Sequence, residues 1–402
     1  MMKVAIMGHG VVGSGVAELL RANAAHIAEK AGDSIEIKRI LDLRDFPDCP
    51  YADLFTKSFD DIANDPEIGI VVETMGGLHP AYEFVKTCLL AGKSVVTSNK
   101  ELVAQKGDEL LAIAKENNLN FLFEASVGGG IPVLRPLAQC LSANNVLEIA
   151  GILNGTTNFM LTKMIDDGMQ FEDALKLAQD LGYAERDPSA DVDGLDACRK
   201  ICILAALAYG EHVYPDTVRT EGIRNVSLTD VQYAAKLGGV IKLIGYATQK
   251  EGKIYCTVSP RMVMNDNLLS GVKDVFNAVM VNGDAVGEVV FYGKGAGKLP
   301  TASAVVADVI DEVKHVKARK YLGWSAAGVD NVGDVTTLPV QMMVRVRGDV
   351  AAVKAAFGDV YMVDGIADAE FAFITPKMCE TELVNKLETL NGATVISRFR
   401  LV

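Results

Sequence analysis

The chain of 402 residues is 50% hydrophobic and 23% charged, and it carries a formal net charge of −13 at pH 7. A single core rarely grows to this length, so we expect two or three domains. The acidic balance argues against nucleic acid and anionic membrane as partners, which leaves a small molecule as the expected partner.

Short apolar runs alternate with helical patterns over the first third of the chain. The segments KVAIM, IEIKRIL, GIVVE and SVVT predict buried strands, and NLNFLFEAS predicts one more. Such alternation is typical of βαβ units around a parallel sheet. We therefore expect an α/β, Rossmann-type dinucleotide-binding domain over residues 1–133, to which a helix at about 300–320 returns.

The segment GHGVVGSG follows the first of these strands and opens a helix. Gly8, Gly10 and Gly13 have the spacing GxGxxG, which lets the backbone approach a pyrophosphate at the helix amino terminus. Val11 and Val12 lie at the start of that helix and belong to the same expected site. The pattern indicates dinucleotide binding, and a plain packing turn is the alternative.

Further residues follow the carboxyl ends of predicted strands, where open parallel sheets bind ligands. Asp42 is positioned to hold the ribose hydroxyls of NAD, whereas Arg44 suits the extra phosphate of NADP; an ordinary surface pair is the alternative. Gly76 and Gly77 leave room for a cofactor. Lys100, at the same rim, is suited to hold an anion or a carbonyl, with a solvated helix start as the alternative.

The periodicity becomes mixed over residues 134–299, which indicates an α+β second domain. There FEDALKLAQDLG and LDACRKICILAALAYG predict helices, whereas KIYCTVSPRMV and AVGEVVFYG predict strands. A glycine-rich linker is expected over 321–337. The final segment, 338–402, has the pattern of strand, helix, strand, strand, helix and strand.

The stretch LGYAERDPSADVDGLDACRK, at 181–200, gathers carboxylates ahead of one lysine. Asp193 is the expected N-cap of the following helix, with Asp196 as the acid of a capping box. Asp196 and Lys200 are spaced i, i+4 and share a helix face, and the next turns are apolar all round. Burial lowers the pKa of such a lysine while the neighbouring acid raises it. We predict a proton-transfer group; a simple ion pair is the alternative.

The segment LNGTTNF, at 153–159, places small and hydroxyl residues before a helix. Its backbone is suited to contacts with a carboxylate. An N-cap at Thr156 or Thr157 is the alternative.

The run from Ala178 to Lys200 closely resembles the signature of homoserine dehydrogenases. GHGVVGSG, VVETMGG, TSNKE, EASVGGGIP, GILNGTTNF and GKGAGKLPTASAVVADV resemble landmarks of that family in the same order, so the resemblance covers about residues 3–320. It implies NAD(P)-dependent interconversion of L-homoserine and L-aspartate 4-semialdehyde in the biosynthetic branch towards threonine, methionine and isoleucine.

The resemblance also implies roles for individual residues. Lys200 is expected to be the acid–base group, with Asp196 as its companion. Glu185 is expected to bind the amino group of the substrate, and Lys100 to lie beside the nicotinamide and the substrate. The residues expected to shape the substrate pocket are Asp191, Tyr183, Gly155 and Thr156. The residues expected to hold a structural monovalent cation such as Na⁺, largely through backbone oxygens, are Glu124, Val127, Gly129 and Ile131.

The segment 338–402 resembles a ferredoxin-like ACT regulatory domain, and such domains often bind an amino acid such as threonine. The usual acidic loop after the first strand is replaced by RVRGDVAAV, so a purely dimerising module is the alternative. The resemblance implies that the 134–299 domain binds substrate and dimerises, which gives a homodimer or a homotetramer.

Two other functions compete with this interpretation. An aspartate-semialdehyde dehydrogenase shares the Rossmann start but needs a cysteine nucleophile beside a base. A catalytically inactive dinucleotide-binding regulator with an ACT sensor is the second. Seven cysteines without a CxxC pair indicate reduced thiols and a cytoplasmic protein, and the longest apolar run, at about 201–208, is too short to span a membrane.

Overall fold

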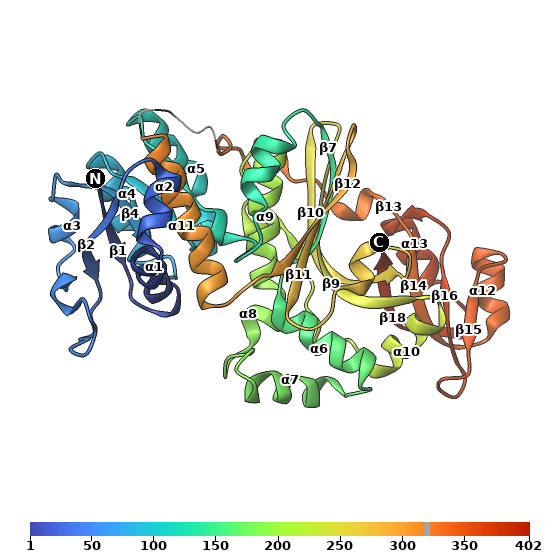
Figure 1. The fold of residues 1–402 in the computed structure, drawn as a ribbon. Coiled ribbons are helices and arrows are strands. Elements are labelled where there is room, and N and C mark those ends of the chain that lie inside the picture. Colours follow the sequence, from blue (N-terminus) through green and yellow to red (C-terminus); the bar gives the residue numbers. More distant parts are fainter. Residues whose placement is uncertain (317, 319–321) are drawn as a thin grey trace.

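The computed structural model describes residues 1–316, 318 and 322–402 (Figure 1). Two β-sheets organise them: a six-stranded sheet from the amino-terminal part of the chain and a ten-stranded sheet from the rest. Within these described residues, no helix is long and apolar enough to cross a membrane.

The amino-terminal sheet is entirely parallel and has the order β3-β2-β1-β4-β5-β6. This is the order of a Rossmann sheet, so the predicted α/β class is confirmed. Its strands are β1 (Met2–Met7), β2 (Ile35–Leu41), β3 (Phe55–Thr56), β4 (Ile68–Glu73), β5 (Ser94–Thr97) and β6 (Phe121–Leu122). The strand predicted at NLNFLFEAS has only two residues, because the chain then turns into a 3₁₀ helix, Glu124–Ser126.

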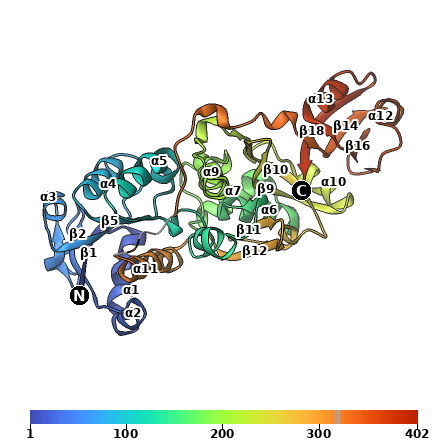
Figure 2. The same ribbon diagram turned by 90° about the horizontal axis from the view of Figure 1, so that it is seen from above.

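Helices cover both faces of this sheet, as Figure 2 shows, and they bury the continuous apolar runs of β1 and β4 between them. On one face lie α1 (Val11–Ala22), α2 (Ala24–Ala31) and α11 (Lys298–Lys314), and on the other α4 (Ala81–Leu90) and α5 (Lys100–Glu116). A single turn, α3 (Asp60–Ala63), precedes β4. The helix predicted at about 300–320 ends at Lys314; residues 317 and 319–321 lie outside the described part of the chain.

The second sheet has the order β12-β11-β7-β9-β10-β18-β14-β16-β15, with β8 paired to β10. The strands of its first part are β7 (Val146–Ile152), β8 (Arg219–Thr220), β9 (Gly239–Lys250), β10 (Lys253–Met264), β11 (Phe276–Gly283) and β12 (Gly287–Lys294). The helices α6 (Gly155–Asp166) and α9 (Leu195–Tyr209) pack against these strands. Three further helices, α7 (Phe171–Asp180), α8 (Ser189–Val192) and α10 (Leu228–Lys236), complete this part.

The carboxyl-terminal part continues the same sheet. Its elements are β14 (Met342–Gly348), α12 (Val350–Phe357), β15 (Met362–Asp364), β16 (Glu370–Ile374), α13 (Glu380–Glu388) and β18 (Ala393–Leu401), with a short pair β13 (Pro339–Val340) and β17 (Met378–Cys379). Apart from that pair, this is the predicted order of elements. β18 pairs with β14 on one side and, in parallel register, with β10 on the other, where Arg261 lies opposite Arg400. The remaining short helical segments are Ala52–Leu54, Pro136–Cys140, Pro215–Thr217, Leu268–Gly271, Val329–Asn331 and Val335–Thr337.

Candidate active site

The turn between β1 and α1 has the geometry of a phosphate-binding loop. Gly8 has a φ of +94°, which residues with a side chain rarely adopt. A Cβ on Gly13 would lie 1.9 Å from the carbonyl oxygen of Gly8, so this close packing requires glycine. A Cβ on Gly10 would meet nothing within 4 Å, and Val11 beside it is exposed. The loop is therefore open where a pyrophosphate would meet the N–H groups of the helix, while Val12 packs against the core.

Asp42 and Arg44, predicted as opposing determinants of cofactor choice, bond to each other. Arg44 donates from Nε to Asp42 Oδ1 at 3.0 Å and from Nη2 to Asp42 Oδ2 at 2.9 Å. Asp42 Oδ2 also accepts the backbone N–H of His9 at 2.7 Å, which ties the pair to the glycine loop. The hydrogen bonds from Arg44 hold the pKa of Asp42 well below its usual range. The Arg44 side chain is 62% exposed, so its guanidinium keeps a solvent-facing side.

A buried carboxylate that the sequence interpretation missed shapes the next loop. Glu73, the last residue of β4, accepts the N–H groups of Met75 at 2.7 Å and Gly76 at 3.2 Å, and the hydroxyl of Thr97 at 2.5 Å. Burial raises its pKa. Gly76 and Gly77 both have positive φ and are exposed, as a close cofactor contact requires. The sequence feature that could have indicated Glu73 is its position as the one acid at the end of the apolar run GIVVE.

This loop is joined to the helix that carries Lys100. Asn99 caps α5, since its Oδ1 accepts the N–H of Leu102 at 3.1 Å, and its Nδ2 donates to the carbonyl of Gly77 at 2.6 Å. The start of α5 is thereby fixed at the carboxyl edge of the parallel sheet. From that edge α5 packs against α9 of the second sheet (Figure 1).

Lys100 and Lys200 meet at one carboxylate between the two sheets. Lys200 donates to Asp196 Oδ2 at 2.8 Å, and Lys100 Nζ lies 2.5 Å from Asp196 Oδ1. Lys200 also donates to the carbonyl of Leu153 at 2.8 Å. The side chains of Asp196 and Lys200 are 5% and 10% exposed, whereas that of Lys100 is 40% exposed. Lys200 thus lies where α9 meets α5 and does not project into bulk solvent.

Burial and mutual charge set the protonation of this cluster. Burial lowers the pKa of Lys200, and the positive charge of Lys100 lowers it further. The negative charge of Asp196 raises this pKa but does not cancel the two other effects. The charge of Asp196 raises the pKa of Lys100. Burial alone would raise the pKa of Asp196, but the two ammonium groups outweigh it and hold that pKa well below its usual range. Of the three groups, Lys200 is therefore the one whose pKa is shifted towards neutral pH.

Asn154, which the sequence interpretation also missed, holds two acids in place. Its Nδ2 donates to Asp196 Oδ2 at 2.9 Å and to Asp191 Oδ1 at 2.7 Å. Its Oδ1 accepts the N–H of Thr157 at 2.8 Å, so Asn154 is the N-cap of α6, and the alternative of a cap at Thr156 or Thr157 is wrong. Burial raises the pKa of Asp191. The sequence feature that could have indicated Asn154 is the strong preference of asparagine for the N-cap position of a helix.

The start of α9 also differs from the prediction. The helix begins at Leu195 after Gly194, which has a φ of +82°, and Asp193 ends α8 instead of capping α9. Asp193 forms an ion pair with Arg224 at 2.5 Å. A Cβ on Gly194 would lie 3.2 Å from Val258 of β10, a tertiary contact that capping preferences do not reveal. Asp196 and Lys200 nevertheless form the predicted i, i+4 pair.

The other predicted substrate residues lie on the loops beside this cluster. Thr156 donates its hydroxyl to the carbonyl of Tyr183 at 2.7 Å, and the Tyr183 ring contacts Phe159 in a T-shaped arrangement. A Cβ on Gly155 would lie 2.8 Å from a carbonyl oxygen of the loop before β11, so glycine is required there. Glu185 is exposed, and its carboxylate has no hydrogen bond or ion pair among the residues described.

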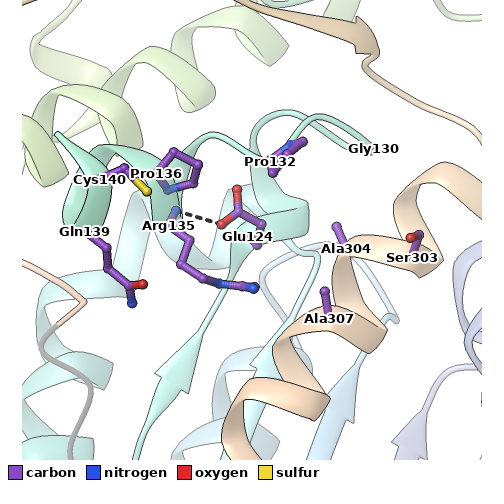
Figure 3. Close-up of a pocket in the computed structure, with 10 residues that line it drawn as sticks. All are labelled: Glu124, Gly130, Pro132, Arg135, Pro136, Gln139, Cys140, Ser303, Ala304 and Ala307. Atoms are coloured by element: carbon purple, nitrogen blue, oxygen red, sulfur yellow. Dashed lines mark hydrogen bonds between the residues drawn. The ribbon is translucent and has the colours of Figure 1, made fainter. Parts of the chain in front are cut away.

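The carboxylate of Glu124 faces backbone N–H groups. It accepts those of Val133 at 2.6 Å, Leu134 at 2.8 Å and Arg135 at 2.8 Å. Figure 3 shows the last of these bonds. A cavity of about 350 Å³ lies beside it, between this turn and α11. The described part of the chain contains no group of three or more His, Cys, Asp or Glu side chains that would hold a metal.

The glycine loop, the Gly76 and Gly77 turn and Lys100 all follow strands of one parallel sheet, and the Lys200 and Asp196 pair faces them from the second sheet. A dinucleotide site on a Rossmann sheet beside a group able to exchange a proton defines the class of NAD(P)-dependent oxidoreductases.

Comparison with known proteins identifies the family within this class. Residues 8–124 match the model of the homoserine dehydrogenase NAD binding domain, and residues 132–310 match that of homoserine dehydrogenase. The homoserine dehydrogenase of Pseudomonas aeruginosa is 46% identical over 314 residues, which are 78% of this chain and 72% of that protein. The chain belongs to the homoserine dehydrogenase family, and the two alternative functions are not favoured.

Solved structures agree with this assignment. The crystal structure of a homoserine dehydrogenase from Thiobacillus denitrificans is 36% identical, with a TM-score of 0.89, and the match covers 100% of this chain and 98% of that one. A hyperthermophilic archaeal homoserine dehydrogenase in complex with NADPH is 31% identical, with a TM-score of 0.68, over 79% of this chain and 99% of that one.

Proposed function

We propose that Lys200 is the acid–base group with which this chain interconverts L-homoserine and L-aspartate 4-semialdehyde. The observation that carries the proposal is the bonding of Lys200. Its ammonium has three N–H donors, of which one reaches Asp196 and one the carbonyl of Leu153. The third remains for a substrate oxygen.

In the direction of oxidation, neutral Lys200 accepts the hydroxyl proton of homoserine while a hydride leaves the carbinol carbon. NAD(P)⁺, when bound, supplies the hydride acceptor. In the reverse direction, the Lys200 ammonium donates its proton to the aldehyde oxygen as the hydride arrives at the carbon. Acid–base help of this kind contributes roughly 10²- to 10⁴-fold in rate.

The neighbouring residues tune and position Lys200. Lys100 keeps Asp196 ionised, and its positive charge favours the neutral form of Lys200. Asp196 in turn orients Lys200 through the 2.8 Å hydrogen bond. We also propose that Lys100 contacts the substrate, because its side chain is more exposed than that of Lys200.

For the amino group of homoserine we propose Glu185, whose exposed carboxylate has no protein partner among the described residues. Asp191, Tyr183, Gly155 and Thr156 would complete the pocket. The dinucleotide would be held by Gly8, Gly10, Val11, Val12, Gly13, Asp42, Arg44, Gly76 and Gly77.

Steady-state and binding measurements on Lys200→Met test the proposal. The variant should bind NADPH with normal affinity by fluorescence titration and lose turnover by at least about 10²-fold. Lys176→Met, which removes an exposed lysine on α7, is the control and should keep normal turnover. Near-normal turnover in Lys200→Met would refute the assignment.

Four further expectations complete the proposal. A monovalent cation such as Na⁺ would bind the carbonyl oxygens of Glu124, Val127, Gly129 and Ile131, with a structural role. The resemblance to the family supports a homodimer or homotetramer and an amino-acid effector at residues 338–402. The free state of all seven cysteines supports a cytoplasmic location.

A further inference from the structure

A polar cavity lies where the middle part of the second sheet meets the carboxyl-terminal part. Its volume is about 360 Å³, which is the size of a small-molecule site. Arg261 and Tyr246 line it from β10 and β9, and Arg400 lines it from β18. These residues are distinct from the cluster around Lys200, because α9 packs on the opposite face of β10, where Val258 lies close to Gly194.

Arg261 is a buried cation without a carboxylate partner. It is 5% exposed, and its Nε has no hydrogen-bond partner among the described residues. The described part of the chain provides no ion pair for it either. Its guanidinium lies over the ring of Tyr246, 4.4 Å from the centroid, which orients the fork without neutralising its charge.

The two other buried arginines among the described residues, Arg345 and Arg400, each have a carboxylate partner, which Arg261 does not. Arg345 bonds to both Asp230 and Glu370. Arg400, directly opposite Arg261 on the neighbouring strand, makes two hydrogen bonds of 2.8 Å to Glu380. A buried charge is normally paired in this way, because an unpaired one is strongly unfavourable.

The acidic side chains around the cavity are already engaged or exposed, and the one lysine that lines it, Lys377, is exposed. Glu380 is held by Arg400, and Glu148 accepts the hydroxyl of Tyr246 at 2.7 Å. Glu288, at the rim, is exposed. These carboxylates disfavour a dianion such as phosphate in the cavity, whereas a single negative charge opposite Arg261 is compatible with them.

We propose that this cavity binds a small organic monocarboxylate, held by the guanidinium of Arg261. The planar fork of arginine matches a carboxylate in two parallel hydrogen bonds. Gln341 at the wall donates from Nε2 to the carbonyl of Thr375 at 3.2 Å, and its amide oxygen remains for the rest of the molecule. The site joins the sheet that supports α9 to the carboxyl-terminal part, and it does not depend on the function proposed for Lys200.

Titration of the full-length protein with acetate tests this site, with sodium chloride keeping the ionic strength constant. A ligand that binds only the folded state raises Tm as its concentration exceeds Kd. We expect acetate to raise Tm by at least about 2 °C over chloride, with matching heat in isothermal titration calorimetry. Phosphate at equal ionic strength should give no such rise. Absence of an acetate-specific effect in the native protein overturns the proposal.

Variants locate the effect. Arg261→Met should abolish the acetate shift, and Arg261→Lys, which keeps the charge but loses the fork, should weaken it about tenfold. Arg398→Met is the matched control, since it removes an exposed arginine from β18 and should respond like the native protein. Without acetate, Arg261→Met should melt no lower than the native protein, because it removes an unpaired buried charge.

Two results would overturn the assignment. An acetate shift that persists in Arg261→Met places the anion elsewhere. A lower Tm of Arg261→Met together with a smaller assembly in light scattering shows that a carboxylate of a second copy, not a free molecule, pairs with Arg261. Calorimetry on the native protein and on Arg261→Lys decides the question even if Arg261→Met fails to fold.

Discussion

Lys100 lies on α5, beside the parallel sheet, and Lys200 lies on α9, which packs on the second sheet. The ammonium of Lys100 is nevertheless 2.5 Å from Asp196 Oδ1, and that of Lys200 is 2.8 Å from Asp196 Oδ2. The carboxylate therefore joins the cofactor-binding part of the molecule to the part that carries the acid–base group. A second bond beside it, from Arg199 to Glu101 at 2.7 Å, links the same two helices. The chemistry and the relative position of the two sheets thus depend on the same few residues.

Asp196→Asn removes the charge that both lysines share. We expect a loss of ~3–5 kcal/mol in the free energy of unfolding, because two buried or half-buried ammonium groups lose their partner. In the native protein the pKa of Asp196 lies below its usual value, so its stabilising effect is complete above about pH 4 and is lost as the pH falls further. Urea unfolding at pH 7 and below pH 4 measures both effects. A variant as stable as the native protein at pH 7 would contradict this prediction.

Lys100→Gln should change the pH dependence of turnover. Oxidation of homoserine requires neutral Lys200, so kcat should rise with pH through a pKa below about 10.4, the usual lysine value. The charge of Lys100 lowers that pKa, so its removal should move the rising limb to higher pH. Lys106→Gln, on the same helix, is the control. An unchanged limb in Lys100→Gln would show that the two lysines are not coupled.

Asn154→Ser separates helix capping from the positioning of the acids. Serine is a good N-cap, but it lacks the amide that donates to Asp191 and Asp196. We expect Tm to change little and kcat to fall by about tenfold, because the charged hydrogen bond that orients Asp196 is lost. The Kd for NADPH should stay normal. An unchanged kcat in this variant would show that Asn154 only caps α6 and does not position Asp196 for catalysis.

Arg44→Ala should shift cofactor preference towards NAD. The variant frees the carboxylate of Asp42 for ribose hydroxyls and removes the cation beside it. We expect kcat/KM with NADP to fall about tenfold relative to NAD, the effect of one charged hydrogen bond. Lys57→Ala removes a nearby exposed charge and serves as the control. An equal loss with both cofactors would exclude Arg44 from the choice.

The parallel sheet, the glycine loop and the pairing of Asp196 with Lys200 could all be predicted, since each depends on residues close together in the sequence. The hydrogen bonds of Asn154 and Glu73 and the ion pair of Lys100 with Asp196 could not. Asn154 reaches residues 37 and 42 positions away, and Lys100 meets Asp196 only because α5 packs on α9. The predicted cap of α9 was wrong because Gly194, with a φ of +82°, starts the helix and packs against β8 and β10, which capping preferences do not reveal.

The pairing of β18 with β10 also limits how the carboxyl-terminal part can act. If the chain were shortened before β14, this end of β10 would become a sheet edge with unpaired backbone N–H and C=O groups. Such an edge pairs readily with strands of other molecules. Such a truncated enzyme should aggregate rather than behave as an unregulated version of itself. Among the described residues, the carboxyl-terminal part also contacts α10, where Arg345 of β14 bonds to Asp230. A displacement of β14 and β18 would therefore act on β10 and α10 together.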